Sequence, residues 1–268
     1  HMLRTTLPRY LANTAVLMFS VGLLTAMIGT GAAWMVVMYQ FPGRRILQWA
    51  LLMPLAVPAY VGAYALVDFL EYAGPVQTTL REVMGWATAQ DYWFPGIRTR
   101  SAAVLVLSMA LYPYVYLLAR AAFREQSGAA YEVAQALGAG AFGRFWRVGL
   151  PLARPAIAAG VAVVMMETVN DFGTVDYFAV QTLTTGIFSV WLQGGNLGGA
   201  AQLATCVLGL IILLVALEKF SRRKSKFFGS ARGQRPVSAA MLYGWRAWAV
   251  TLCCLIPVIG GFILPVAV

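Results

Sequence analysis

The sequence has little charge and only one histidine. Charged residues make up 11% of its 268 positions, against about 25% in an ordinary soluble domain, and 60% of the residues are hydrophobic. A surface that faces water cannot be built from this composition. The histidine is His1, which excludes a Ser-His-Asp triad, and the three cysteines have no spacing typical of a metal site. We therefore predict a membrane protein that is not an enzyme and binds no nucleic acid.

Long runs without charge predict the membrane-spanning helices, because about 20 apolar residues cross a bilayer. Runs free of Asp, Glu, Lys and Arg cover residues 11–39, 46–67, 101–119, 178–217 and 247–268. Glycines near 194–199 divide the fourth run into a short interfacial or re-entrant helix and a span over 200–217. A further span over 155–172 begins at Pro155, a favoured residue in a first helical turn. The expected fold is an all-α, polytopic bundle of about five complete spans and one truncated span.

Basic residues predict which loops face the cytoplasm. Fifteen of the 20 Lys and Arg residues fall in segments 44–45, 120–154 and 219–246, which we place inside. We then expect residues 1–10 to be a periplasmic tail after a missing first span, and 72–100 an interfacial outer loop. Residues 11–220 form the transmembrane domain, 221–246 a basic cytoplasmic linker that contacts anionic lipid, and 247–268 the first span of a second, truncated half. The chain begins His1-Met2 and ends in an apolar run, so we expect a longer polypeptide.

The inner loop 120–154 contains a motif. Its residues Glu132-Val133-Ala134, Gly138 and Leu150-Pro151 stand at fixed offsets. The pattern resembles the EAA loop of binding-protein-dependent ABC importer permeases, the MetI-like transmembrane domains, although Val133 replaces an alanine. The resemblance implies a cytoplasmic coupling helix that docks on a dimer of ABC ATPase subunits. It also implies a periplasmic substrate-binding protein and a second permease half as partners, with ATP and Mg on the ATPase and no cofactor on this chain.

The physical pattern of the loop agrees with this resemblance. We expect a helix over 131–137, a break at Gly138 and Gly140, and a second helix over 141–147 that carries an aromatic ridge. The alternative is that these aromatics lie at the lipid interface and the arginines only set topology. The residues assigned to ATPase coupling are Glu132, Ala134, Gly138, Phe142, Arg144, Phe145, Trp146, Leu150 and Pro151.

A dinucleotide fingerprint in the same loop is a false match. Residues 138–143 read G-x-G-x-x-G, but they follow a predicted helix rather than the buried strand that this motif requires. Arg144-Phe145 also replaces the Lys-Ser/Thr pair of a Walker A loop. We predict that ATP is hydrolysed by another chain.

Four further segments resemble the ferric-iron branch of these permeases. They are residues 42–45, 51–58, 111–116 and 166–174, and the likeness covers about 7–223. Members of that branch usually carry two halves in one chain, which supports the expectation of a second half. The resemblance implies ferric iron as substrate.

Acidic and polar residues of the 155–172 span suggest a translocation path. Glu167, Asn170 and Asp171 share one helix face, and Asp176 and Tyr177 follow near the outer mouth. At about 1.5 Å of rise per residue, Glu167 lies roughly 18 Å along the helix from Pro155, past the midplane of the membrane. An ionisable group at this depth is costly and indicates a pathway or a buried partner. We expect no tight metal site, but transient contact of a cation with Glu167 and Asp171. The alternative is that Asn170 and Asp171 cap or turn the backbone while Glu167 hydrogen-bonds to a neighbouring helix.

The sequence thus predicts a multi-pass permease of a bacterial inner membrane that imports ferric iron by alternating access. Thiamine, polyamine or an inorganic anion are alternative substrates within the same superfamily. An ion-coupled secondary transporter or channel is a second alternative, since it also carries intramembrane carboxylates and broken helices. A non-transporting membrane scaffold is the third.

Overall fold

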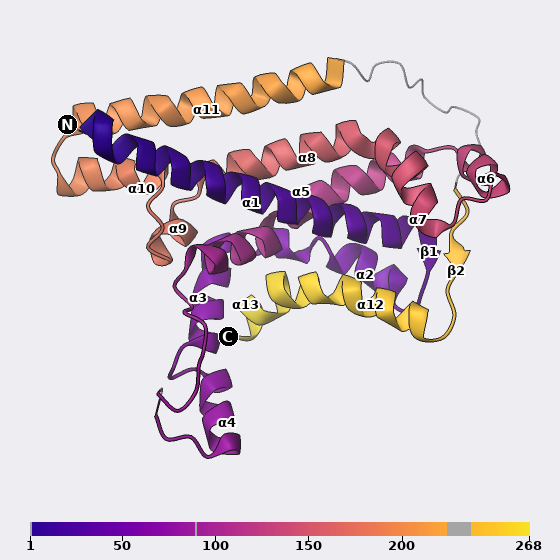
Figure 1. Ribbon diagram of the computed structural model, residues 1–268, viewed down its shortest axis with the longest axis horizontal. Helices are drawn as coiled ribbons and strands as arrows, with labels where there is room; N and C mark the ends of the chain where they lie inside the picture. The colour runs from indigo at the N-terminus through magenta and orange to yellow at the C-terminus, as the bar shows by residue number, and fades with distance from the viewer. Residues whose placement is uncertain (1, 89, 224–236) are drawn as a thin grey trace.

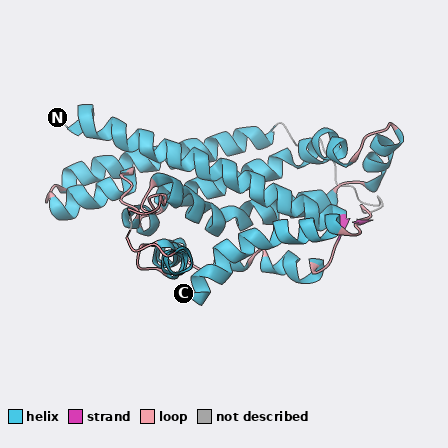
Figure 2. Cartoon of the chain, turned by 60° about the horizontal axis from the view of Figure 1, so that its bottom comes forward, coloured by secondary structure: helices cyan, strands magenta, loops and turns pink. Residues whose placement is uncertain are grey.

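Three long helices form the centre of the molecule. In the computed structural model, which describes residues 2–88, 90–223 and 237–268, α1 (Met2–Met38), α5 (Arg100–Glu125) and α8 (Leu150–Asn170) pack against one another (Figure 1). Helix α11 (Leu197–Arg223) lies along α8, and α12 (Trp245–Val258) contacts α1. Apart from one two-stranded pair, the regular structure drawn in Figure 2 is helical. The all-α prediction is confirmed.

The described residues contain five helices long and apolar enough to cross a membrane, or six if a bent pair counts as one. They are Leu7–Met38, Arg100–Glu125, Ala141–Asn170, Leu197–Phe220 and Trp245–Ala267. The spans expected over 11–39, 101–119, 200–217 and 247–268 lie within or overlap these helices. The residues before position 11, expected as a periplasmic tail, are helical from Met2, and α1 continues through Pro8.

The span expected over 46–67 is not one straight helix. It divides into α2 (Arg44–Ala50), a 3-10 turn η1 (Met53–Ala56) and α3 (Ala59–Leu70). The helical stretch Arg44–Ala56 is bent by 96° relative to the stretch Ala59–Met84 that follows it. Pro54 lies in the 3-10 turn and Pro58 directly precedes α3. Proline lacks the N–H that a continuing helix needs, so the two prolines set the break.

The expected outer loop continues from α3. Helix α4 (Pro75–Met84) lies in this loop and projects with α3 away from the three central helices (Figure 1). Arg81 ties the loop together by donating to the Tyr72 carbonyl at 2.8 Å and to the Tyr92 hydroxyl at 3.1 Å. The side chains of Val83 and Trp93 are exposed.

The span expected to begin at Pro155 begins earlier. A short α6 (Gly128–Ala136) and α7 (Ala141–Arg144) precede a π-helical turn η2 (Phe145–Gly149), which runs directly into α8. Pro155 therefore lies inside α8, and Pro151 occupies its first turn, where a missing N–H costs no hydrogen bond. Glu167 is consequently about 26 Å along the helix from Leu150, rather than about 18 Å from Pro155.

The segment 178–193 forms the short helix that was expected. After α9 (Gly173–Tyr177), helix α10 (Leu183–Phe188) begins with a capping box between Thr182 and Thr185 and ends in a π-helical turn η3 (Ser189–Gln193). The Thr14 hydroxyl of α1 accepts a hydrogen bond from the Leu183 N–H at 3.0 Å. Helix α10 is therefore attached to the bundle.

The last described segment returns to the first loop. Strand β1 (Tyr39–Gln40) pairs in parallel with β2 (Ala240–Met241), and α12 continues through η4 (Ile259–Ile263) into α13 (Leu264–Ala267). Half of the expected linker 221–246, positions 224–236, lies outside the described residues. The pairing places segment 240–246 at the end of the bundle that also carries α6 and α7 (Figure 1).

Candidate functional site

The motif loop is a helix pair joined by glycines. Helix α6 ends because Gly138 adopts a left-handed conformation with φ of +82°, which glycine reaches without steric cost. The Ala139 N–H then donates to the Ala134 carbonyl at 2.9 Å and closes the end of the helix. Gly140 is extended and precedes α7. The predicted first helix and the break at Gly138 and Gly140 are confirmed, whereas the second helix is not separate but continues through η2 into α8.

A buried polar and aromatic cluster holds this loop on the bundle. Tyr131 of α6 is 5% exposed, and its hydroxyl donates to Gln126 Oε1. Gln126 Nε2 donates to the Gly149 carbonyl at 3.1 Å, which links the end of α5 to the end of η2, directly before α8. The ring of Trp34, from α1, lies 6.0 Å from the Tyr131 ring and 5.3 Å from the Phe123 ring. Burial raises the pKa of Tyr131, so the hydroxyl stays protonated and remains a donor.

The sequence interpretation did not identify this cluster. Trp34 and Tyr131 are separated by almost a hundred positions, and Gln126 belongs to no motif. Their apolar or amide character alone carries no signal of a shared contact. Only the packing of α1 against the loop brings them together.

The expected aromatic ridge is divided by the π-helical turn. Phe145 points inward, with its ring 5.0 Å from that of Trp34, whereas Phe142 is 76% exposed and Trp146 52% exposed. The prediction that all three form one docking ridge is therefore wrong for Phe145. Two further apolar residues of the loop are exposed, Val133 of α6 at 59% and Leu137, which directly follows α6, at 82%. We call Val133, Leu137, Phe142 and Trp146 the apolar loop surface.

The remaining predicted coupling residues divide between surface and support. Glu132 is exposed on α6, while Ala134 is half-buried. Arg144 donates to Gln135 Oε1 at 3.2 Å and so joins α7 to α6. Leu150 and Pro151 are half-buried in the first turn of α8, where they support the loop.

The predicted path residues lie at the opposite end of α8. Glu167 and Asn170 are exposed, but Asp171 is half-buried and accepts hydrogen bonds from the backbone N–H groups of Thr174 and Val175 at 3.0 and 3.1 Å. Asp171 also accepts from the Thr174 hydroxyl at 3.1 Å. Asp171 therefore caps the backbone at the start of α9, as the alternative interpretation expected. Glu167 remains the exposed carboxylate on this face of α8.

Basic side chains reach the same end from other elements. Asp176 is exposed, while the Tyr177 ring lies 4.2 Å from that of Tyr64 and beneath the Arg98 guanidinium at 5.2 Å. Arg98 also pairs with Glu71 at 3.4 Å. No Lys or Arg occurs between positions 155 and 217. This end of the molecule is nevertheless not uniformly acidic, because Arg98 reaches it from another segment. Among the described residues, no three His, Cys, Asp or Glu side chains come together as a metal-binding group.

The fold and the motif loop agree with a known family. Residues 20–226 match the family described as "Binding-protein-dependent transport system inner membrane component", and the chain belongs to this family of multi-pass inner-membrane permeases. The expectation drawn from the EAA resemblance is confirmed at the level of the family.

Individual relatives differ in what they transport. The chain is 25% identical to the Fe(3+)-transport system permease protein FbpB 2 of Haemophilus influenzae, over 87% of this chain and 41% of that protein. It is 28% identical to a probable sulfate transport system permease protein cysT of Nephroselmis olivacea, over 77% of this chain and 72% of the relative. It is 25% identical to the molybdenum transport system permease protein ModB of Escherichia coli, over 69% of this chain and 79% of the relative. The chain thus spans less than half the length of the ferric relative and most of the other two.

A solved structure shares the fold. It is a bacterial alginate ABC transporter in complex with an alginate pentasaccharide-bound periplasmic protein, with a TM-score of 0.67 and 19% identity over 84% of this chain and 82% of the matched chain. This likeness shows that the two chains share the same arrangement of helices.

Proposed function

We propose that this chain is the permease part of an ATP-driven importer that accepts substrate from a periplasmic binding protein and moves it by alternating access. The observation that carries the proposal is the apolar loop surface, which is exposed beside Glu132 on a loop anchored by Tyr131 and Trp34. Exposed apolar groups on a rigid support are typical of a protein interface. The partner is a dimer of ABC ATPase subunits, which binds ATP and Mg, and a second permease half completes the pore.

Ferric iron is the proposed substrate. The support is the similarity to a ferric-iron permease together with the exposed carboxylates of Glu167 and Asp176, since a hard cation prefers oxygen ligands. An inorganic oxyanion is the second candidate, because sulfate and molybdenum permeases are also similar. Arg98 and Arg100 stand at the same end, where Arg100 donates to Asn13 Oδ1 at 2.9 Å.

Uptake by the reconstituted system tests both proposals. The full-length permease, its ATPase and its binding protein are placed in proteoliposomes, and accumulation of ferric iron is compared with that of sulfate, molybdate, thiamine and a polyamine. We expect iron accumulation that requires ATP and the binding protein. Uptake of an oxyanion alone would reject iron and leave the importer assignment intact.

The ion-coupled alternative is tested in the same vesicles. An ATP-driven importer keeps its uptake when ionophores collapse the proton and sodium gradients, whereas a secondary transporter loses it. Uptake without ATP that disappears with the gradient would reject the proposed mechanism. Absence of any binding-protein-stimulated ATPase activity would favour the scaffold alternative.

A further inference from the structure

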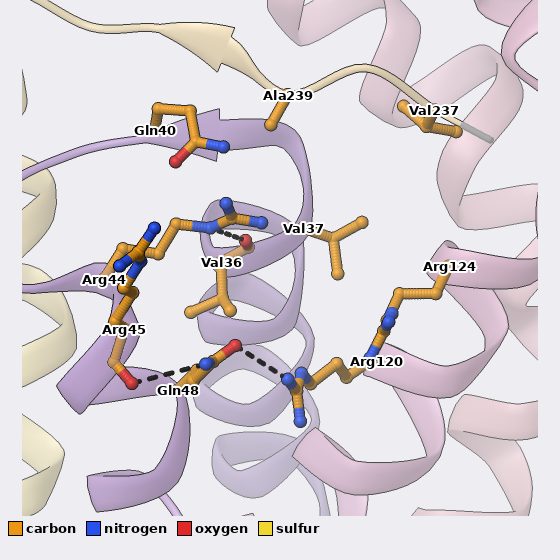
Figure 3. Close-up of a pocket in the computed structure, with 10 residues that line it drawn as sticks. All are labelled: Val36, Val37, Gln40, Arg44, Arg45, Gln48, Arg120, Arg124, Val237 and Ala239. Atoms are coloured by element: carbon orange, nitrogen blue, oxygen red, sulfur yellow. Dashed lines mark hydrogen bonds between the residues drawn. The ribbon is translucent and has the colours of Figure 1, made fainter.

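Four arginines converge on one cavity at the end of the bundle that carries the coupling loop. The cavity has a volume of about 480 Å³ and lies where α1 ends, α2 begins and α5 ends (Figure 3). Arg44 and Arg45 come from α2, and Arg120 and Arg124 come from the last turns of α5 on the other side. Val36, Val37 and Val237 add apolar lining.

Two of these arginines are fixed by hydrogen bonds. Arg44 Nε donates to the Val36 carbonyl at 2.6 Å, and an Arg120 Nη2 donates to Gln48 Oε1 at 2.9 Å. Gln48 is itself held by donating to the Arg45 carbonyl at 3.3 Å. The Arg120 Nε is buried and has no hydrogen-bond partner among the described residues. Among the residues drawn in Figure 3, the guanidinium groups of Arg45 and Arg124 make no hydrogen bond.

The cavity has no negative charge of its own. None of the ten described residues that line it is acidic. Like charges that share a partly enclosed space repel one another, and a buried donor without a partner costs free energy. The rule that basic residues face the cytoplasm explains positive charge at this end of the bundle, but it does not explain why four arginines share one cavity. An exposed arginine such as Arg154 on α8 satisfies the rule equally well.

We propose that this cavity binds a phosphate group, supplied by an anionic phospholipid headgroup or by a free phosphate. Guanidinium forks match the oxygens of a phosphate, and two facing pairs reach it from both sides. The valines beside the arginines suit the glycerol end of a lipid, and the cavity lies where the apolar helices end. The bound phosphate offsets part of the positive charge of the four arginines and joins α2 to α5. This site is separate from the substrate path and does not depend on which substrate is transported.

Thermal unfolding of the purified full-length permease tests the proposal. The wild-type protein, the double variant Arg45→Gln/Arg124→Gln and the matched control Arg154→Gln are compared in phosphatidylcholine nanodiscs. Phosphatidylglycerol in the nanodiscs and inorganic phosphate in solution are the two probes. Because a ligand that binds only the folded protein raises its melting temperature, we expect a rise of about 2–4 °C in the wild type and in Arg154→Gln. The double variant is expected to show less than a third of this rise.

The pattern of response identifies the source of the phosphate. A rise with phosphatidylglycerol alone indicates the lipid headgroup, and a rise with inorganic phosphate as well indicates a free anion; both support the site. An equal rise in all three proteins, or none in the wild type, would overturn the proposal. If the double variant does not fold, Arg45→Gln and Arg124→Gln are measured singly, and each is expected to lose at least half of the rise. Native mass spectrometry counts the phosphatidylglycerol retained per permease as an independent readout.

Discussion

Gly138 has an open environment but a restricted backbone. Its φ is +82°, and a Cβ placed there would meet nothing within 4 Å. Any effect of a substitution therefore comes from the left-handed conformation, which costs other residues roughly 1–2 kcal/mol, and β-branched residues more. We expect Gly138→Val to lower binding-protein-stimulated ATPase activity by about tenfold or more, because α6 and α7 no longer keep their relative orientation. The measurement is ATP hydrolysis by the reconstituted transporter.

Two substitutions serve as controls for this prediction. Asparagine tolerates the left-handed region, so Gly138→Asn should keep most of the activity. Gly140 has an ordinary φ of −65° and equally open space, so Gly140→Ala should behave as wild type. Full activity in Gly138→Val would show that the left-handed backbone of Gly138 does not matter for coupling. Loss of activity in Gly140→Ala would show that the effect is not specific to that conformation.

Gly149 presents the opposite situation, with an ordinary backbone and no space. A Cβ at this position would contact Trp34 Cζ3 and lie 3.1 Å from the Tyr131 hydroxyl. Since overpacking a closed site costs about 1–3 kcal/mol, Gly149→Ala should lower the melting temperature by several degrees. Gly143→Ala is the control, because its Cβ would make an ordinary contact of 3.6 Å with Ala139. Equal melting temperatures for the two variants would contradict the description of the anchor.

At the scale of elements, the π-helical turn η2 directs neighbouring aromatic side chains to different environments. Phe142 and Trp146 are exposed, whereas Phe145 packs on Trp34. We expect Phe142→Ala/Trp146→Ala to weaken binding of the ATPase by about tenfold or more with little change in melting temperature, because exposed aromatics act only in the interface. Phe145→Ala should instead destabilise the permease by about 2 kcal/mol, less than the loss at a fully buried phenylalanine. Pull-down titration and thermal unfolding, measured on the same preparations, distinguish the two effects.

A charge change on the same loop gives a further test. Glu132 is exposed on α6 next to the apolar loop surface, so Glu132→Lys should leave the melting temperature unchanged and abolish stimulated ATPase activity. The reason is that a reversed charge at an interface opposes the partner without disturbing the fold. Ala129→Lys, at another exposed position of the same helix, provides the matched control. An active Glu132→Lys variant would reject its assigned role in coupling.

The elements that could be predicted from the sequence are those with local signals. Helix α5 and the break at Gly138 follow from an uninterrupted apolar run and from glycine placement. The bend between α2 and α3 was missed because a charge-free run says nothing about direction, although Pro54 and Pro58 cause it. The inward direction of Phe145 depends on a π-helical turn that a period of 3.6 residues does not represent.

Contacts between distant segments could not be predicted. The pairing of β1 with β2 and the contact of Trp34 with Tyr131 join positions about one to two hundred residues apart, and no local pattern reports them. The arginine cavity is of the same kind. Each arginine was interpreted singly as a topology signal, and only the approach of α2 to α5 shows that four of them share one space.

At the scale of the whole molecule, we propose different tasks for the two ends of α8. The π-helical turn η2 leads directly into its first turn, and Glu167 lies near its other end, so one helix connects the apolar loop surface to the proposed path. Because Glu167 is exposed whereas Asp171 caps α9, their substitutions should act differently. Glu167→Gln should reduce iron uptake several-fold at an unchanged melting temperature, because it removes a charge that attracts the cation.

Asp171 supplies the comparison that makes this prediction decisive. Asp171→Ala removes the acceptor of two backbone N–H groups and should cost about 1 kcal/mol of stability, whereas Asp171→Asn keeps an acceptor and should retain both fold and uptake. Radioactive iron uptake and thermal unfolding are measured on the same proteoliposome preparations. Normal uptake in Glu167→Gln would remove this residue from the path, and a loss in Asp171→Asn equal to that in Glu167→Gln would mean that the charge of Asp171, rather than its cap, serves transport.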